Sequence, residues 1–85
     1  MPSRTVSVGS RVGLHARPAA IVSEAAQRLD DPVTVARTGH DPVDARSALL
    51  IMTLGARFGD PVEVAGDDPA AVDAIATLIE QDLDA

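Results

Sequence analysis

The chain has 85 residues, with 13 acidic side chains against 7 basic ones and a formal net charge of −6 at pH 7. This length predicts one small domain, residues 1–85, with a limited hydrophobic core. The absence of cysteine excludes disulfides, cysteine-based metal sites and thiol chemistry. Phe58 is the only aromatic residue, and every basic residue is an arginine. A nucleic-acid-binding surface, which combines a basic patch with aromatic side chains, is therefore not expected.

The first part of the chain predicts a strand, a loop and a helix. Residues 5–8 alternate and are rich in β-branched side chains, as in a strand, and residues 9–13 form a loop. A helix is expected over residues 16–29, because one apolar stripe runs along it: Ala19, Val22, Ala26 and Leu29. Pro18 is compatible with this helix, since the N–H groups of a first turn have no partner inside the helix.

The middle of the chain predicts a hairpin and a short helix. Strands at residues 33–37 and 42–45 flank a turn at residues 38–41. Residues 48–54 are apolar on nearly all sides, and periodicity alone does not separate a buried strand from a helix there. A short helix is favoured, because alanine, leucine and methionine are good helix formers and Ser47 can cap it.

The last part predicts a strand at residues 61–65 and a helix capped by Asp68, with Pro69 in its first turn. Its apolar stripe is Val72, Ile75, Ala76, Ile79 and Leu83. The order βαββαβα predicts an α+β fold with two layers, an antiparallel sheet with helices on one face. No secretion signal is expected, and the apolar run 48–52 is too short to span a bilayer. The protein should be cytoplasmic, without membrane insertion.

The start of the first helix holds two residues that local helix preferences disfavour. His15 occupies the N-cap, where Ser, Thr, Asp or Asn is usual, and Arg17 places a cation against the positive end of the helix dipole. Both choices make sense if a phosphate binds there, held by backbone N–H groups and the Arg17 guanidinium. The same terminus favours neutral imidazole, whose lone pair can act as a nucleophile. The alternative is a surface histidine beside a solvated charge. A metal site is not expected, because His40 is the only other histidine.

Residues 13–20 (Gly-Leu-His-Ala-Arg-Pro-Ala-Ala) resemble the active-site signature of HPr, the histidine-containing phosphocarrier family of the bacterial phosphoenolpyruvate:sugar phosphotransferase system. The resemblance continues through Arg46-Ser47 before an apolar stretch, Thr53-Leu54-Gly55, and Gly59-Asp60 before a valine-rich strand. It implies an open-faced sandwich with strand order 1-4-2-3 and three helices on one face.

The resemblance also implies a function and its residues. His15 would accept a phosphoryl group on Nδ1 from phosphorylated enzyme I and pass it to EIIA domains of sugar permeases. Arg17, with Ala16 beside it, would bind the phosphate. The protein would be a carrier rather than an enzyme, without a cofactor, and a monomer is expected. The alternatives are the nitrogen-related paralogue, which has the same chemistry but a regulatory output, and a non-catalytic interaction module.

The apolar second helix is expected to form part of the same functional surface as His15. Its apolar residues are too many for the one face that packs on the core, so some of them should lie outside it. The resemblance implies that these form a docking patch beside His15, made of Ala20, Ala48, Leu49 and Met52. The alternative is a fully buried helix. Ser47 matches the serine that a bifunctional HPr kinase/phosphorylase modifies in many relatives. The sequence Arg46-Ser47-Ala48-Leu49-Leu50 departs from the usual Lys-Ser-Ile-Met-Gly pattern, which argues against that regulation.

Overall fold

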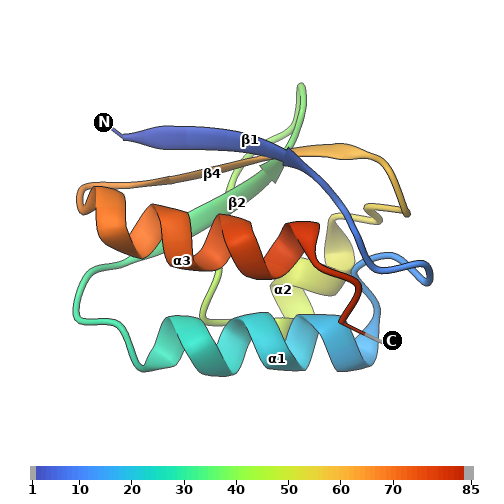
Figure 1. Ribbon diagram of the computed structural model, residues 1–85, viewed down its shortest axis with the longest axis horizontal. Helices are drawn as coiled ribbons and strands as arrows, with labels where there is room; N and C mark the ends of the chain where they lie inside the picture. Colours follow the sequence, from blue (N-terminus) through green and yellow to red (C-terminus); the bar gives the residue numbers. More distant parts are fainter. Residues whose placement is uncertain (1, 84–85) are drawn as a thin grey trace.

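The computed structural model describes residues 2–83, in which three helices cover one face of a four-stranded sheet (Figure 1). The element order is the predicted βαββαβα. The strands are β1 (Ser3–Ser7), β2 (Val33–Arg37), β3 (Val43–Asp44) and β4 (Pro61–Gly66). The helices are α1 (Ala16–Gln27), α2 (Ala48–Thr53) and α3 (Pro69–Glu80). The predicted fold class is confirmed.

β4 lies in the interior of the sheet and runs antiparallel to both of its neighbours. The strand order is β1-β4-β2-β3, as the resemblance implied. Val64 of β4 is opposite Arg4 on one side and Val35 on the other. The segment before His15 is therefore fixed by a strand that comes much later in the chain.

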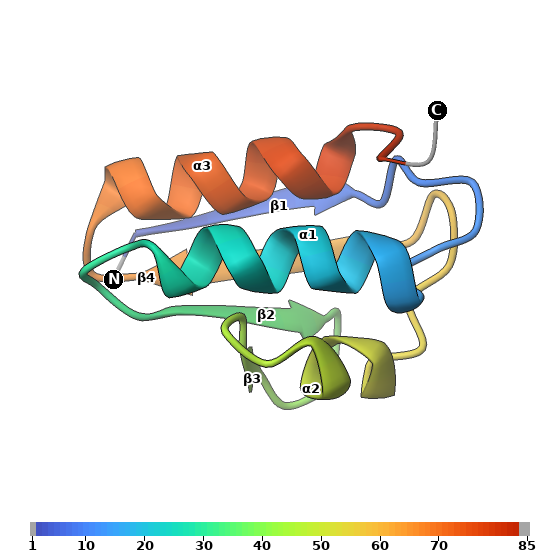
Figure 2. The same cartoon turned by 90° about the horizontal axis from the view of Figure 1, so that it is seen from below.

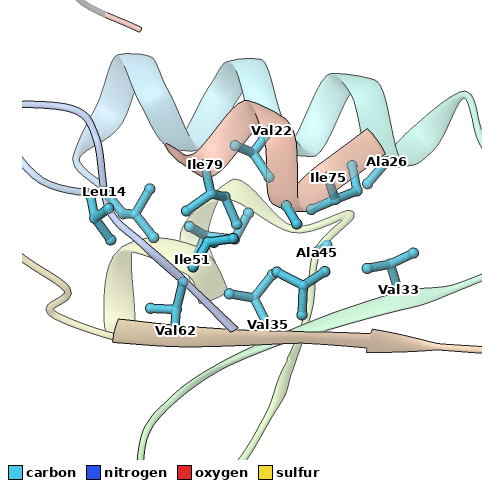
Figure 3. Close-up of a cluster of buried hydrophobic side chains, with 14 of the residues drawn as sticks. Leu14, Val22, Ala26, Val33, Val35, Ala45, Ile51, Val62, Ile75 and Ile79 are labelled. Carbon is cyan, nitrogen blue, oxygen red and sulfur yellow. The ribbon is translucent and has the colours of Figure 1, made fainter. Parts of the chain in front are cut away.

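The core lies between the sheet and the helices and consists of aliphatic side chains. Every second residue of a strand faces it, so Val35 and Val62 point toward Val22 of α1 and Ile75 of α3 (Figure 3). On β1 and β4, the other face of the sheet carries polar residues such as Thr5 and Glu63. Within residues 2–83, the large hydrophobic side chains that stay exposed are Val12, Leu49, Leu50 and Phe58.

Several element boundaries differ from the prediction, for local reasons. β3 is shorter than residues 42–45, because Ala45 turns into the core and the Arg46 N–H bonds to the Asp44 carboxylate at 2.9 Å. α1 ends before Leu29, where a tighter turn bonds the Leu29 N–H to the Ala26 carbonyl at 3.1 Å. The Leu29 carbonyl, which another helical turn would use, instead accepts a hydrogen bond from the Arg46 guanidinium, also at 3.1 Å.

The end of α3 also differs from the prediction, because the helix stops before the last residue of its predicted apolar stripe. Leu83 lies beyond α3, yet it still packs against the core as the stripe predicted. Within residues 2–83, no helix has both the length and the apolar character needed to cross a bilayer.

Two large aliphatic residues of α2, Ile51 and Leu49, give a test of this packing. Ile51 is fully buried, whereas Leu49 is 69% exposed. Ile51→Ala should lower the free energy of unfolding by about 2–5 kcal/mol, because it leaves a cavity in the core. Leu49→Ala should change it by no more than about 0.5 kcal/mol. Urea unfolding of both variants measures the difference, and similar losses would contradict the placement of α2.

Candidate functional site

At one end of the molecule, where α1 begins, the loop before α1 meets the end of α3 and the segment between α2 and β4 (Figure 2). The Gly9 N–H donates to the Ile79 carbonyl near the end of α3 at 2.9 Å. The Leu14 N–H donates to the Ala56 carbonyl at 3.0 Å, in the segment that joins α2 to β4. The loop before His15 is thus held from two sides by backbone hydrogen bonds.

Gly13 and Leu14 fix the chain immediately before His15. Gly13 has φ +78°, and a Cβ at this position would lie 2.6 Å from the Ala56 carbonyl oxygen, so a side chain does not fit. Leu14 is 3% exposed and points into the core (Figure 3). His15 therefore starts from a backbone with little freedom to move.

His15 is the N-cap of α1, as predicted. Its carbonyl accepts the Ala19 N–H at 2.8 Å, the first bond of the helix, but its side chain makes no capping hydrogen bond. The first turn contains no acidic residue, and Pro18 lies within it as expected. The amide of Ala16 then has no acceptor inside the helix, because of its position. The positive end of α1 is left without a compensating side-chain cap.

The other two helices start differently, which makes the start of α1 distinctive. The Ser47 hydroxyl accepts the Leu50 N–H at 3.2 Å at the start of α2. The Asp68 carboxylate accepts the Ala70 N–H at 3.1 Å at the start of α3. Both predicted caps are confirmed. Regulatory phosphorylation of Ser47 stays a prediction, and its hydroxyl already has a structural role.

The candidate residues of α1 lie on an open surface. His15, Ala16 and Arg17 are exposed, whereas Pro18 and Ala19 are buried beneath them. Two surface hollows, of about 500 and about 200 Å³, are lined by other residues and include neither His15 nor Arg17. A site for a small substrate is usually a concave pocket, so this exposed histidine is suited to a macromolecular partner.

α2 lies beside the amino-terminal half of α1 and divides its apolar residues between the core and the surface (Figure 2). Leu49 is exposed, as the docking hypothesis expected. Ala48 and Met52 are half-buried and pack against the core, and Ala20 of α1 is half-buried as well. Leu50, which sequence reasoning did not single out, is 41% exposed.

Two further exposed hydrophobic residues lie on loops, Val12 close to His15 in the chain and Phe58 at the hollow beside β1. Val12 is 54% exposed in the loop before α1, and Phe58 is 60% exposed between α2 and β4. Sequence reasoning missed both, although a lone aromatic residue next to Gly59 in a predicted loop was an available signal. His40 lies exposed in the β2–β3 turn. In the described part of the chain, no group of His, Asp and Glu is arranged to hold a metal.

Comparisons with known proteins agree with this architecture. The family model described as "PTS HPr component phosphorylation site" matches residues 2–81. The HPr-C-His structure from Thermoanaerobacter tengcongensis has a TM-score of 0.88 and 30% identity, covering 100% of this chain and 98% of that one. Phosphocarrier HPr from Bacillus anthracis has a TM-score of 0.84 and 27% identity, covering 92% and 95%. The chain belongs to the HPr family of phosphocarriers of the phosphotransferase system.

A curated relative gives a more local match. Phosphocarrier protein HPr of Streptomyces coelicolor is 49% identical over 45 residues, which is 53% of this chain and 48% of that protein. The match thus spans about half the length of this curated relative. Members of the family are carriers rather than catalysts.

The close approach at Gly13 gives a second test. Gly13→Ala should destabilise the fold by more than about 2 kcal/mol, because it adds a steric clash to the cost of a left-handed backbone. Gly39 is the matched control, since its φ is +82° but no atom lies within 4 Å of a Cβ built there. Gly39→Ala should cost only the backbone term, about 1–2 kcal/mol. Equal losses in thermal or urea unfolding would show that the contact with Ala56 does not constrain the loop.

Proposed function

We propose that this protein carries a phosphoryl group on His15, taking it from phosphorylated enzyme I and delivering it to EIIA domains of sugar permeases. The observation that carries the proposal is the exposed His15 at the uncapped start of α1. A helix N-terminus attracts phosphate, and here no side chain of the first turn competes for it. Membership of the phosphocarrier family supports the same chemistry.

The transfer needs a nucleophile and stabilisation of negative charge. The lone pair of a neutral imidazole nitrogen forms the new N–P bond, while the bond from phosphorus to the donor breaks and its electron pair stays with the donor. In this proposal the Ala16 amide and the Arg17 guanidinium stabilise the phosphoryl oxygens. Phosphoryl transfer depends mainly on such positioning and charge, so few residues are required.

The partners dock on the surface around His15. In this proposal the contact residues are Ala20, Ala48, Leu49 and Met52, together with Leu50. Leu49 and Leu50 present apolar side chains on α2, and removal of such area from water drives association. We place the carrier in the cytoplasm, where one monomer exposes the same face to donor and acceptor in turn.

The proposal is tested directly by finding which residue carries the phosphoryl group. Incubation with enzyme I and phosphoenolpyruvate should give one acid-labile, base-stable phosphate per protein, detected by intact mass. His15→Ala should abolish it, because the accepting nitrogen is lost. His40→Ala is the matched control and should retain full phosphorylation, since His40 lies in the β2–β3 turn. Phosphate that survives His15→Ala would refute the proposal.

Arg17 should affect the rate of transfer rather than the fold. Its exposed position predicts a change in the free energy of unfolding within about 0.5 kcal/mol for Arg17→Ala. Transfer from phosphorylated carrier to an EIIA domain should slow by about tenfold or more, because a charged donor to the transferring group is lost. Rapid-quench kinetics measure this rate. A rate equal to that of the unaltered protein would remove Arg17 from the mechanism.

A further inference from the structure

The sheet ends in two edge strands that differ in how well they are protected. β3 forms one edge, and it has only two residues and follows Pro42, so it offers little backbone for pairing. β1 forms the other edge and has five residues; it is the upper strand in Figure 1. Among residues 2–83, no strand pairs with the outer side of β1. β1 is therefore the edge that is open to a further strand.

The outward main-chain groups of β1 follow from its pairing with β4. The Val8 N–H donates toward the β4 side at 3.0 Å, and the Pro2 carbonyl accepts from β4 at 3.1 Å. In an antiparallel pair, every second residue of a strand makes these bonds. The residues that alternate with them, and so turn their N–H and C=O groups away from β4, are Ser3, Thr5 and Ser7.

The side chains of β1 leave this edge uncovered. Charged side chains that project from an edge strand protect it from pairing. Arg4 is the charged residue of β1, and its guanidinium turns onto α3, 3.4 Å from both Asp73 and Thr77. The same guanidinium donates to Glu80 at 3.0 Å. Arg4 thus fastens β1 to α3 and does not guard the outward main-chain groups.

A hollow of about 500 Å³ runs along the same edge. It is lined by residues 4–9, Phe58, Gly59 and Glu80. Its volume is within the range of ligand pockets, about 300–1,000 Å³, so it has room for several side chains. Phe58, 60% exposed, offers an apolar contact there. His15 is not among the lining residues, so the hollow is a surface separate from the phosphoryl acceptor.

The surface on both sides of β1 is acidic. On the α3 side, the side chains of Asp73 and Glu80 are 71% and 41% exposed. On the other face of the sheet, Glu63 is exposed opposite Thr5. Arg4 offsets only part of this negative charge. A segment with lysine or arginine side chains is complementary to such a surface, whereas a second copy of this chain would bring the same carboxylates together.

We propose that β1 is a docking edge for an extended, basic segment of a partner protein, which joins the sheet as a fifth strand. The main chain of that segment pairs with the outward groups of residues 3–7, as in recognition by β-strand addition. Its cationic side chains face Asp73 and Glu63, and an apolar side chain contacts Phe58. The inference goes beyond the proposed function, because it assigns a second partner surface that takes no part in phosphoryl transfer.

Binding is tested on the intact, ¹⁵N-labelled protein with a peptide of about eight residues in which valine and lysine alternate, long enough to cover β1. Amide shifts in ¹H–¹⁵N spectra locate the peptide and give its Kd. The amides of Ser3, Thr5 and Ser7 should shift most. With peptide at about ten times its Kd, their exchange with deuterated water should slow about tenfold, because exchange then requires release of the peptide.

Two altered peptides separate main-chain pairing from charge. N-methylation of the central amides removes hydrogen-bond donors and should weaken binding at least tenfold. A peptide with glutamate in place of lysine should also bind at least tenfold more weakly at low salt, because like charges repel. Equal affinity of the N-methylated peptide would overturn the strand pairing. Equal affinity of the glutamate peptide would overturn the basic character of the partner.

Variants of the protein test the same edge from the other side. Thr5→Pro removes an outward N–H without removing a bond to β4, and it should weaken the valine–lysine peptide about tenfold. The N-methylated peptide tests these hydrogen bonds on the unaltered protein, so the outcome does not depend on the folding of Thr5→Pro. Glu63→Gln combined with Asp73→Asn should weaken binding about fivefold at low salt. Glu24→Gln is the matched control, since Glu24 is exposed on α1, and it should leave the affinity unchanged.

Three further results would each overturn the inference. One is the absence of binding by the valine–lysine peptide at millimolar concentration. Another is a set of shifts centred on α2 and residues 15–20, which would place the peptide on the surface around His15. The third is self-association that protects the amides of β1 without any peptide, because a second copy would then occupy the edge.

Discussion

The insertion of β4 between β1 and β2 is the constraint on which the rest of the structure depends. β4 pairs with both neighbours along its length and brings the first strand beside the last third of the chain. The segment before β4 is thereby carried to the loop before His15, where Ala56 accepts the Leu14 amide. The site is therefore assembled only when distant segments have paired, and such non-local contacts slow folding relative to a helical bundle.

The start of α1 shows how the fold keeps a reactive position open. α2 and α3 each use a polar side chain to satisfy their first amides, and a cap of this kind contributes about 1 kcal/mol to stability. α1 has a histidine at that position, and the histidine side chain does not bond to the helix. The loop before His15 is held in other ways, by the buried Leu14 and by the backbone hydrogen bonds of Gly9 and Leu14.

Much of this fold follows from local sequence patterns. The stripes of α1 and α3, the caps at Ser47 and Asp68, and the N-cap position of His15 are confirmed, because each depends on residues within one or two turns. The short β3 was not predictable in its length, since Ala45 leaves the strand to fill a gap in the core that only the assembled helices create. The strand order came from the family resemblance, because patterning does not specify which strands pair.

The candidate site could be predicted only where it depends on local sequence. His15 and Arg17 stand out locally, as residues that disfavour a helix start. The burial of Met52 and the exposure of Leu50 depend on how α2 rotates against α1, and a six-residue apolar helix contains no polar stripe that would fix that rotation. The close approach of Ala56 to Gly13 is a tertiary contact that no local pattern reports.

The uncapped start of α1 has a thermodynamic consequence for a carrier. A phosphoryl group enclosed by many donors would be bound too stably to leave, and its group-transfer potential would be lost. At this terminus the amide of Ala16 and one nearby guanidinium lie on an open surface, where water competes for the same oxygens. Such sparse stabilisation keeps the energies of donor, carrier and acceptor close to one another. In the proposed role, the exposure of His15 thus serves the release of the group as much as its arrival.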